Sequence, residues 1–313
     1  MAILYIVIPC YNEQEVLPET TKRLCDKLNT LVINGVVDAR SRILYVDDGS
    51  RDNTWQLIEQ YHNESESVCG VKLAHNRGHQ KALWGGLMTA MEYADCVISM
   101  DADLQDDVDI IDGFLNEYAK GNEIVFGVRS ARKTDTAFKR ITAEGYYKLL
   151  QKMGVDVVFN HADCRLMSKR ALQELSRYRE VNLFLRGMVK DIGLQTSIVT
   201  YERAERFAGE SKYPLTKMLA LAVDGITSFS VLPLKLITRL GAFISILSLC
   251  GMLAGIVLAI LQLPCALCFL LSSIWLVCGI LLLCLGIVAT YIGKLYTEVK
   301  DRPRYAADKL LIK

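Results

Sequence analysis

Two aspartates that alternate at the end of an apolar run are well placed to bind a cation. Asp101 and Asp103 follow the run 96–100 (CVISM) and are separated by one alanine. Alternate carboxylates at the end of a strand can converge on one hard cation, which keeps waters and phosphate oxygens as its other ligands. Bound Mg²⁺ or Mn²⁺ would stabilise a diphosphate as a leaving group, so the pair predicts metal-assisted phosphate chemistry. A surface acidic cluster is the alternative interpretation.

Two further polar clusters follow apolar runs in the same way. Residues 9–13 (PCYNE) end the first run, and residues 47–50 (DDGS) end the second. The adjacent carboxylates Asp47 and Asp48 could accept hydrogen bonds from a base or a ribose. Both clusters also have a simpler interpretation, because Asp and Gly form turns after strands and a proline can end one.

The elements that carry these clusters alternate between strand and helix. Short apolar runs predict strands at 3–9, 42–46, 71–73, 96–100 and 123–127. Helical spacing predicts helices at 15–31, 54–61, 80–93 and 109–118. This alternation predicts a parallel sheet of βαβ units, and ligands bind outside the carboxyl ends of such strands. All three polar clusters fall at strand ends, so we expect them to form one site.

The three clusters, in this order, resemble glycosyltransferase family 2. The residues that carry the resemblance are 8–13 (IPCYNE), 46–54 (VDDGSRDNT) and 101–106 (DADLQD). The match is best to the polyprenyl-phosphate branch, which includes bactoprenol glucosyltransferases and dolichyl-phosphate mannose synthases. It continues through 76–80 (NRGHQ), 162–168 (ADCRLMS), 209–214 (GESKYP) and 298–303 (EVKDRP). Cys164 departs from the pattern, which has an aromatic residue after the aspartate.

The resemblance implies a GT-A type fold, with a Rossmann-like, mixed and mainly parallel sheet. It also implies inverting transfer of a sugar from a nucleoside-diphosphate sugar to polyprenyl phosphate. Glucose from UDP-glucose and undecaprenyl phosphate are the first choices, and GDP-mannose or another UDP-sugar is the alternative donor. A non-catalytic membrane scaffold with a transferase-like domain is the rival from another class. A processive synthase is less consistent, because we find no QxxRW-like motif.

The same resemblance implies roles for individual residues. Those that would surround Mg²⁺ or Mn²⁺ and the diphosphate are Asp101, Asp103 and Gln105. Those that would bind the nucleotide-sugar are Pro9, Tyr11, Glu13, Asp47, Asp48 and Asp101, with Arg206, Ser211 and Lys212 in a loop that closes on the phosphates. Those that would meet the acceptor phosphate are Arg129 and Arg140. Those that would be catalytic are Asp103 and Asp163, the latter as a base or by orienting the phosphate.

Several of these residues have simpler interpretations from the sequence alone. Arg129 could be a surface arginine that ends a strand. Arg140 lies in a basic stretch and could contact anionic lipid headgroups, as could Lys212. Asp163 could cap the helix that begins near Ser168, although five residues is too far for a direct cap. The histidines are expected to be structural, because none shares metal-ligand spacing with an acid or a thiol.

A long apolar segment sets the C-terminal part of the chain apart. Residues 240–293 include 54 positions without Asp, Glu, Lys or Arg. One helix of this length would run about 80 Å, far more than the roughly 30 Å of a hydrocarbon core. We therefore expect two transmembrane helices, at 240–262 and 266–292, that break at Pro264. A hydrophobic hairpin buried in the protein is the alternative. Basic residues flank both spans, which places the two flanks on the cytoplasmic side.

These features divide the chain into four predicted parts. They are a cytoplasmic GT-A catalytic domain (1–213), interfacial or juxtamembrane helices (214–239), two transmembrane helices (240–293) and a cytoplasmic tail (294–313). Residues 214–229 could instead pack on the catalytic domain. The expected protein is integral to a membrane, most simply the bacterial inner membrane, with the lipid bilayer as a partner and both termini cytoplasmic. Gly251 and Gly255 form a GxxxG pattern, which allows a homo-oligomer or is an ordinary pair of membrane glycines.

Net charge and cysteine spacing argue against a nucleic-acid-binding protein and against a zinc-binding protein. The net charge of +1 provides no global attraction to nucleic acid, so no nucleic-acid partner is expected. The ten cysteines are scattered and none has zinc-ligand spacing with nearby histidines. Disulfides are not expected in a reducing cytosol.

Overall fold

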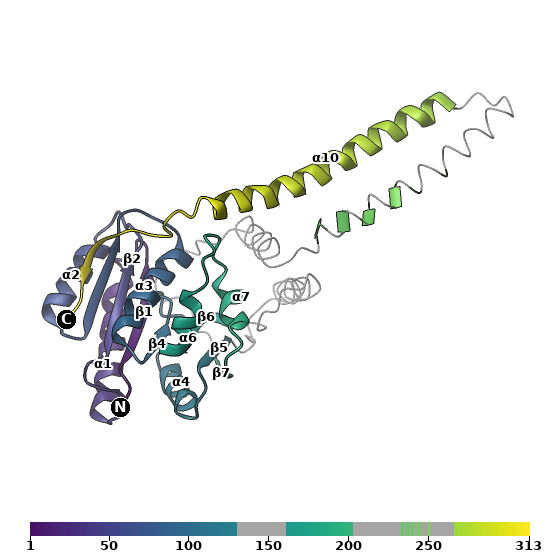
Figure 1. The fold of residues 1–313 in the computed structure, drawn as a ribbon. Helices are drawn as coiled ribbons and strands as arrows, with labels where there is room; N and C mark the ends of the chain where they lie inside the picture. The colour runs from purple at the N-terminus through teal and green to yellow at the C-terminus, as the bar shows by residue number, and fades with distance from the viewer. Residues whose placement is uncertain are drawn as a thin grey trace.

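An eight-stranded mixed sheet with helices on both faces forms the body of the protein (Figure 1). The computed structural model describes residues 1–129, 161–202 and 266–313, together with isolated residues between 233 and 250. The strand order across the sheet is β7-β5-β6-β4-β1-β2-β3-β8. The strands are β1 (Leu4–Cys10), β2 (Arg42–Asp47), β3 (Val68–Leu73), β4 (Cys96–Ser99), β5 (Ile124–Arg129), β6 (His161–Ser168), β7 (Thr196–Tyr201) and β8 (Ala307–Leu311).

The central strands are buried on both faces, which explains their continuous apolar sequences. Every residue of β1 is buried, with Leu4, Ile6 and Ile8 in one core and Tyr5 and Val7 in the other. The helices of the first core are α1 (Leu17–Ile33), α2 (Thr54–Glu64) and α4 (Ile110–Ala119). Those of the second are α3 (His79–Tyr93), α6 (Lys169–Ser176) and α7 (Leu185–Asp191). The result is a three-layer α/β arrangement.

The register of the sheet brings the strand ends together. β1 pairs in parallel with β2 and β4, so that Cys10 lies opposite Asp47 and Val7 lies opposite Ser99. The polar clusters after β1, β2 and β4 therefore meet at one edge, as the sequence predicts.

The sheet is mixed, which confirms that expectation. β6 runs antiparallel to both of its neighbours, β4 and β5, and β8 runs antiparallel to β3. The remaining pairs are parallel, including β5 with β7. β6 brings the segment around Asp163 to the same edge as the end of β4, because Ser99 pairs with Arg165.

The C-terminal segment begins away from the sheet and leads back to it. Helix α10 (Ala266–Val299) extends away from the body (Figure 1), and the chain after it comes back to form β8 on the edge of β3. The Arg304 guanidinium lies 4.0 Å from the ring centroid of Trp84, and Tyr305 packs against Gly85. The last residues are thus an integral part of the sheet domain.

The predicted transmembrane hairpin is wrong. Among the residues that the structure describes, no helix combines the length and the apolar character needed to cross a membrane. The predicted first span, 240–262, lies almost wholly outside the described residues. The predicted second span falls within α10, which continues past it to Val299 and ends against the sheet domain through Glu298. The location predicted from the hairpin was that of an integral membrane protein with cytoplasmic termini. The same finding does not support that location.

Candidate active site

The loop after β2 uses its two aspartates to order neighbouring main chain. Asp48 accepts hydrogen bonds from the backbone N–H groups of Arg77 (2.7 Å) and Gly78 (2.8 Å). Asp47 accepts one from the Ser50 amide at 3.1 Å. The other carboxylate oxygen of Asp47 is buried without a hydrogen-bond partner among the described residues. Burial raises the pKa of both carboxyls, although these hydrogen bonds oppose the rise.

The loop after β1 is bonded to the loop after β2. The Asn12 amide donates to the Ser50 hydroxyl at 2.9 Å, and the Arg51 amide donates to the Asn12 side chain at 2.9 Å. The Glu13 amide donates to the Thr54 hydroxyl at 2.9 Å. The residues predicted to bind the nucleotide, Pro9, Tyr11 and Glu13, therefore lie close to Asp47 and Asp48, where the ends of β1 and β2 and their two loops meet. Pro9 is buried, and Tyr11 and Glu13 are half-buried.

The loop after β4 carries the alternating aspartates in a constrained conformation. Leu104 has a φ of 55°, a left-handed conformation that costs roughly 1–2 kcal/mol for a residue with a side chain. Gln105 is buried, and its amide donates to Asp103 at 3.3 Å. This strained turn places Asp101, Asp103 and Gln105 together at the sheet edge.

Arg129 lies among carboxylates at the end of β5. Its guanidinium is 3.2 Å from Asp106 and 3.7 Å from Asp101, and it donates to the Tyr201 hydroxyl at 3.2 Å. Tyr201 in turn donates to Asp106, whose second oxygen is buried without a hydrogen-bond partner among the described residues. Arg129 is thus a residue of the site and not an isolated surface arginine.

Asp163 is held by two arginines from different elements. Arg186, from α7, donates to both carboxylate oxygens at 3.2 and 3.1 Å, and Arg165 donates to one of them at 2.9 Å. The Ser99 hydroxyl donates to the main-chain oxygen of Asp163 at 2.6 Å. Burial acts to raise the pKa of Asp163, but the charges of Arg186 and Arg165 outweigh it and hold the pKa well below its usual range. Asp163 does not cap α6, since Ser168 does so by accepting from the Ala171 amide.

The site has an excess of negative charge around Asp101. Burial and the neighbouring carboxylates of Asp106, Asp163 and Asp103 raise the pKa of Asp101 to about 6, while His79 opposes the rise. The His79 Nε2 atom lies 3.9 Å from Asp101 and 3.8 Å from Asp163, between the two carboxylates. A bound cation would relieve this repulsion.

The geometry limits how a cation could be held. Within the described part of the chain, no three His, Cys, Asp or Glu side chains form a group that could hold a metal by themselves. Mg²⁺ ordinarily uses one or two carboxylates together with substrate phosphates and water. The unpartnered oxygen of Asp106 and the raised pKa of Asp101 fit a cation of that kind.

Four predicted site residues lie outside the described residues: Arg140, Arg206, Ser211 and Lys212. Four residues of the site, Arg165, Arg186, Asp106 and Tyr201, were not predicted from the sequence. Asp106 and Arg165 fall inside the motifs quoted above, which was the available signal. Arg186 lies 23 residues after Asp163, and no local pattern connects the two.

The chain belongs to glycosyl transferase family 2. The family model matches residues 5–176, more than half of the chain, and covers the three loops that build the site.

Relatives extend the match beyond the family model. The chain is 49% identical to the "uncharacterized glycosyltransferase YkoT" of Bacillus subtilis over 307 residues, which cover 98% of this chain and 91% of the relative. It is 35% identical to the SfII prophage-derived bactoprenol glucosyl transferase of Shigella flexneri, with 97% of each chain covered. Both matches run through the C-terminal part as well as the sheet.

Among solved structures, glucosyl-3-phosphoglycerate synthase from Mycobacterium tuberculosis is similar at a TM-score of 0.45 and 18% identity. The match covers 72% of this chain and 76% of that one. That protein was crystallised with Mn²⁺, uridine diphosphate and phosphoglyceric acid.

Proposed function

We propose that this glycosyltransferase moves glucose from UDP-glucose to a polyprenyl phosphate. The observation that carries the proposal is the meeting of a carboxylate cluster with Arg129 and Asp163 at one sheet edge. Such an edge can hold a donor diphosphate and an acceptor phosphate side by side. The bactoprenol glucosyl transferase of Shigella flexneri, similar over 97% of both chains, supports this acceptor class and this sugar.

The donor side is assigned to the loops after β1, β2 and β4. Pro9, Tyr11, Glu13, Asp47 and Asp48 bind the nucleoside in this proposal, helped by the hydrogen bonds that join their two loops. Arg206, Ser211 and Lys212 are assigned to the phosphates by the family resemblance alone.

Asp101, Asp103 and Gln105 are assigned to the diphosphate end of the donor. These residues would hold Mg²⁺ or Mn²⁺, which when bound neutralises the diphosphate as a leaving group. The charge distribution supports this, because the neighbouring carboxylates of Asp106, Asp163 and Asp103 raise the pKa of Asp101 even though His79 opposes the rise.

The acceptor side is assigned to Arg129 and Arg140. A phosphate monoester has a second pKa near 6 and is largely ionised at neutral pH, so it needs alignment more than deprotonation. An acceptor phosphate oxygen forms the new bond to the anomeric carbon as the bond from that carbon to the nucleoside diphosphate breaks. This single in-line displacement inverts the anomeric centre.

Asp163 orients the acceptor side in this proposal and does not take up a proton. Its low pKa makes it a weak base at neutral pH, and both of its oxygens are engaged by arginines. A carboxylate in this state can hold Arg186 and Arg165 in fixed positions near the incoming phosphate.

A donor screen tests the proposal. Purified protein is incubated with undecaprenyl phosphate and, in separate reactions, UDP-glucose, UDP-galactose, UDP-N-acetylglucosamine and GDP-mannose. We expect lipid-linked product from UDP-glucose at the highest kcat/KM. Preference for another donor would change the sugar, and donor hydrolysis with no lipid-linked product from any donor would contradict the acceptor class.

A further inference from the structure

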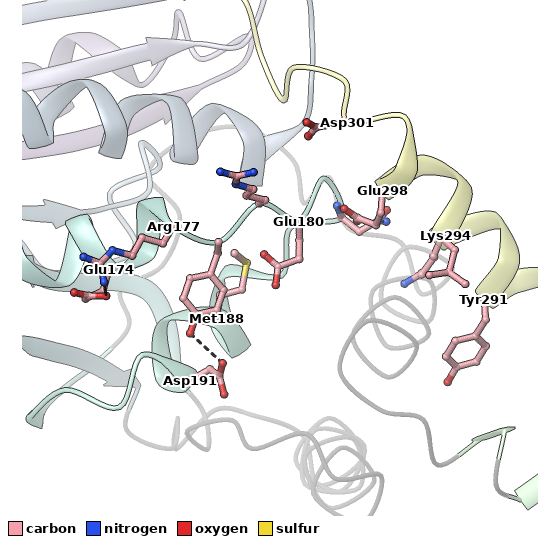
Figure 2. Close-up of a pocket in the computed structure, with 13 residues that line it drawn as sticks. Glu174, Arg177, Glu180, Met188, Asp191, Tyr291, Lys294, Glu298 and Asp301 are labelled. Atoms are coloured by element: carbon pink, nitrogen blue, oxygen red, sulfur yellow. Dashed lines mark hydrogen bonds and ion pairs between the residues drawn. The ribbon is translucent and has the colours of Figure 1, made fainter.

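The end of α10 is tied to the segment that leads into α7, far from it in sequence. Both carboxylate oxygens of Glu298 accept main-chain hydrogen bonds, from the Val181 amide at 2.7 Å and the Asn182 amide at 2.9 Å. The Asn182 side chain adds a third at 2.6 Å. Glu298 stands in the wall of a pocket of about 1220 Å³ between α10 and the segment after α6 (Figure 2).

The segment that Glu298 holds continues directly into the site. Asn182 is followed three residues later by Leu185, the first residue of α7, and then by Arg186, which donates to both oxygens of Asp163. The Leu185 amide also donates to the Gln80 side chain at 3.0 Å. Gln80 is adjacent to His79, which lies beside Asp163.

We propose that Glu298 is a positioning residue that holds residues 181–182 so that Arg186 meets Asp163 in the correct geometry. Residues 177–184 lie between regular elements, since α6 ends at Ser176 and α7 begins at Leu185. The placement of this stretch, which leads into Arg186, depends on contacts with other parts of the chain, and Glu298 supplies three of them. The geometry of the contact between Arg186 and Asp163 is in this way linked to the position of α10.

The chemistry of the contact explains why a carboxylate is used. Backbone N–H groups that point at one carboxylate form charge-assisted hydrogen bonds, which are stronger than neutral ones. A glutamine at position 298 keeps the shape but offers only one accepting oxygen, because its NH₂ group would face an N–H donor. An alanine removes all three contacts.

Hydrogen exchange tests, without any substrate, whether Glu298 holds residues 181–182. In the full-length protein, the amides of Val181 and Asn182 are expected to exchange slowly. Glu298→Ala should speed their exchange roughly 10-fold or more, with Glu298→Gln in between. Glu174→Ala is the matched control, because Glu174 lies in the same pocket wall but bonds to Arg177 and not to this segment. Unchanged exchange at 181–182 in Glu298→Ala would overturn the proposal.

A double-mutant cycle tests whether Glu298 acts on catalysis through Arg186. Its readout rests on the proposed function. With UDP-glucose and undecaprenyl phosphate, Glu298→Ala should lower kcat roughly 2- to 30-fold and leave the Kd for UDP unchanged. In an Arg186→Ala background the same substitution should add little, because Glu298 acts through Arg186. Glu174→Ala should keep wild-type kcat.

The outcomes separate a positioning role from a structural one. If the losses from Glu298→Ala and Arg186→Ala multiply in the double variant, Glu298 acts independently of Arg186 and the proposal fails. A wild type that transfers no glucose to undecaprenyl phosphate contradicts the proposed function instead. The exchange experiment, repeated at the α7 amides that follow Arg186, then decides alone whether Glu298 fixes this helix.

Discussion

Arg129 is a cation that contacts both Asp106 and Asp101 in the carboxylate cluster. Its side chain is 21% exposed, so it can contact both the buried Asp106 and a ligand that enters the site. Burial acts to lower its pKa, but Asp106, Tyr201 and Asp101 raise it above the ordinary arginine value. A permanently charged, planar guanidinium in this position suits a phosphate acceptor.

We expect Arg129→Ala to reduce use of polyprenyl phosphate more than binding of the donor. Loss of one charge-assisted pair costs about 1.5–3 kcal/mol, or roughly 10- to 150-fold in kcat/KM for the lipid. Arg129→Lys should recover part of the loss, because it keeps the charge but not the fork. Kinetics with varied lipid, combined with calorimetry of UDP binding, provides the measurement. A large loss of UDP affinity in Arg129→Ala would move this residue to the donor side.

For Asp163, we expect the isosteric change to asparagine to lower kcat about 100-fold with a smaller effect on the lipid KM. The change removes the charge that holds Arg165 and Arg186 in place. Because the pKa of Asp163 lies well below its usual range, the carboxylate is already ionised throughout the pH 5–8 region. The wild-type plot of kcat against pH should therefore show no inflection from Asp163 there. Asp101, with a pKa of about 6 that Asp163 helps to raise, can itself give an inflection in this range. An inflection between pH 5 and pH 8 that disappears in Asp163→Asn but persists in Asp101→Asn would show that Asp163 acts as a base.

The elements position these residues through their ends and not through their interiors. The loops after β1 and β2 are bonded to each other, and two non-glycine positions have positive φ, Asn12 after β1 and Leu104 after β4. Residues held in such conformations often belong to functional sites, where surrounding contacts offset the cost.

Gly49 tests how tightly the β2 loop is packed. Its φ is 67°, and a Cβ atom there would lie 2.7 Å from the Asn76 nitrogen. Gly35 has the same φ of 67°, but its Cβ would meet only the flexible end of Met1 at 3.4 Å. Gly49→Ala should therefore destabilise the protein by about 1–3 kcal/mol more than Gly35→Ala, as measured by urea unfolding. Equal losses would mean that only the backbone conformation matters at Gly49.

The raised pKa of Asp101, in the loop after β4, predicts that the affinity for a metal depends on pH. The pKa of Asp101 is raised to about 6, so a cation must displace a proton from it in acid. Mn²⁺ binding in the presence of UDP should weaken roughly 10-fold between pH 7 and pH 5, for one competing proton. Asp103→Asn should weaken binding at both values. Electron paramagnetic resonance of free Mn²⁺ measures this, and an affinity that is constant across this range would place the metal away from Asp101.

Most elements in the first 129 residues could be predicted from the sequence, because their signals are local. Continuous apolar runs and helical spacing located β1 to β5 and α1 to α4 to within a few residues. β6, β7 and β8 were not predicted. β7 is largely exposed and β8 is an exposed edge strand, so neither has the buried pattern of a central strand.

At the scale of the whole molecule, the contacts that complete the site join distant parts of the chain. Glu298 bonds to Asn182, and Arg186 bonds to Asp163, across separations that no local pattern records. The predicted hairpin relied on the hydropathy of residues 240–293 alone, and no helix among the described residues is long and apolar enough to cross a membrane. The polar clusters at 9–13, 47–50 and 101–105, in contrast, lie at one sheet edge, because they come at the ends of the parallel strands β1, β2 and β4.

The segment from α10 to β8 also contacts two separate parts of the sheet domain. β8 covers the edge of β3, and Lys309 pairs with Glu59 at 3.0 Å. The segment that begins in α10 and ends in β8 therefore contacts both the β3 edge of the sheet and the stretch that leads to Arg186.

The configuration of the product tests the central claim most directly. Wild-type protein is given UDP-glucose, in which the anomeric linkage is α, together with undecaprenyl phosphate and Mn²⁺, and the lipid-linked product is examined by NMR at the anomeric carbon. A single in-line displacement predicts a β-linked glucosyl phosphate lipid. An α-linked product would contradict the single displacement, and release of free glucose without any lipid-linked sugar would contradict transfer to polyprenyl phosphate.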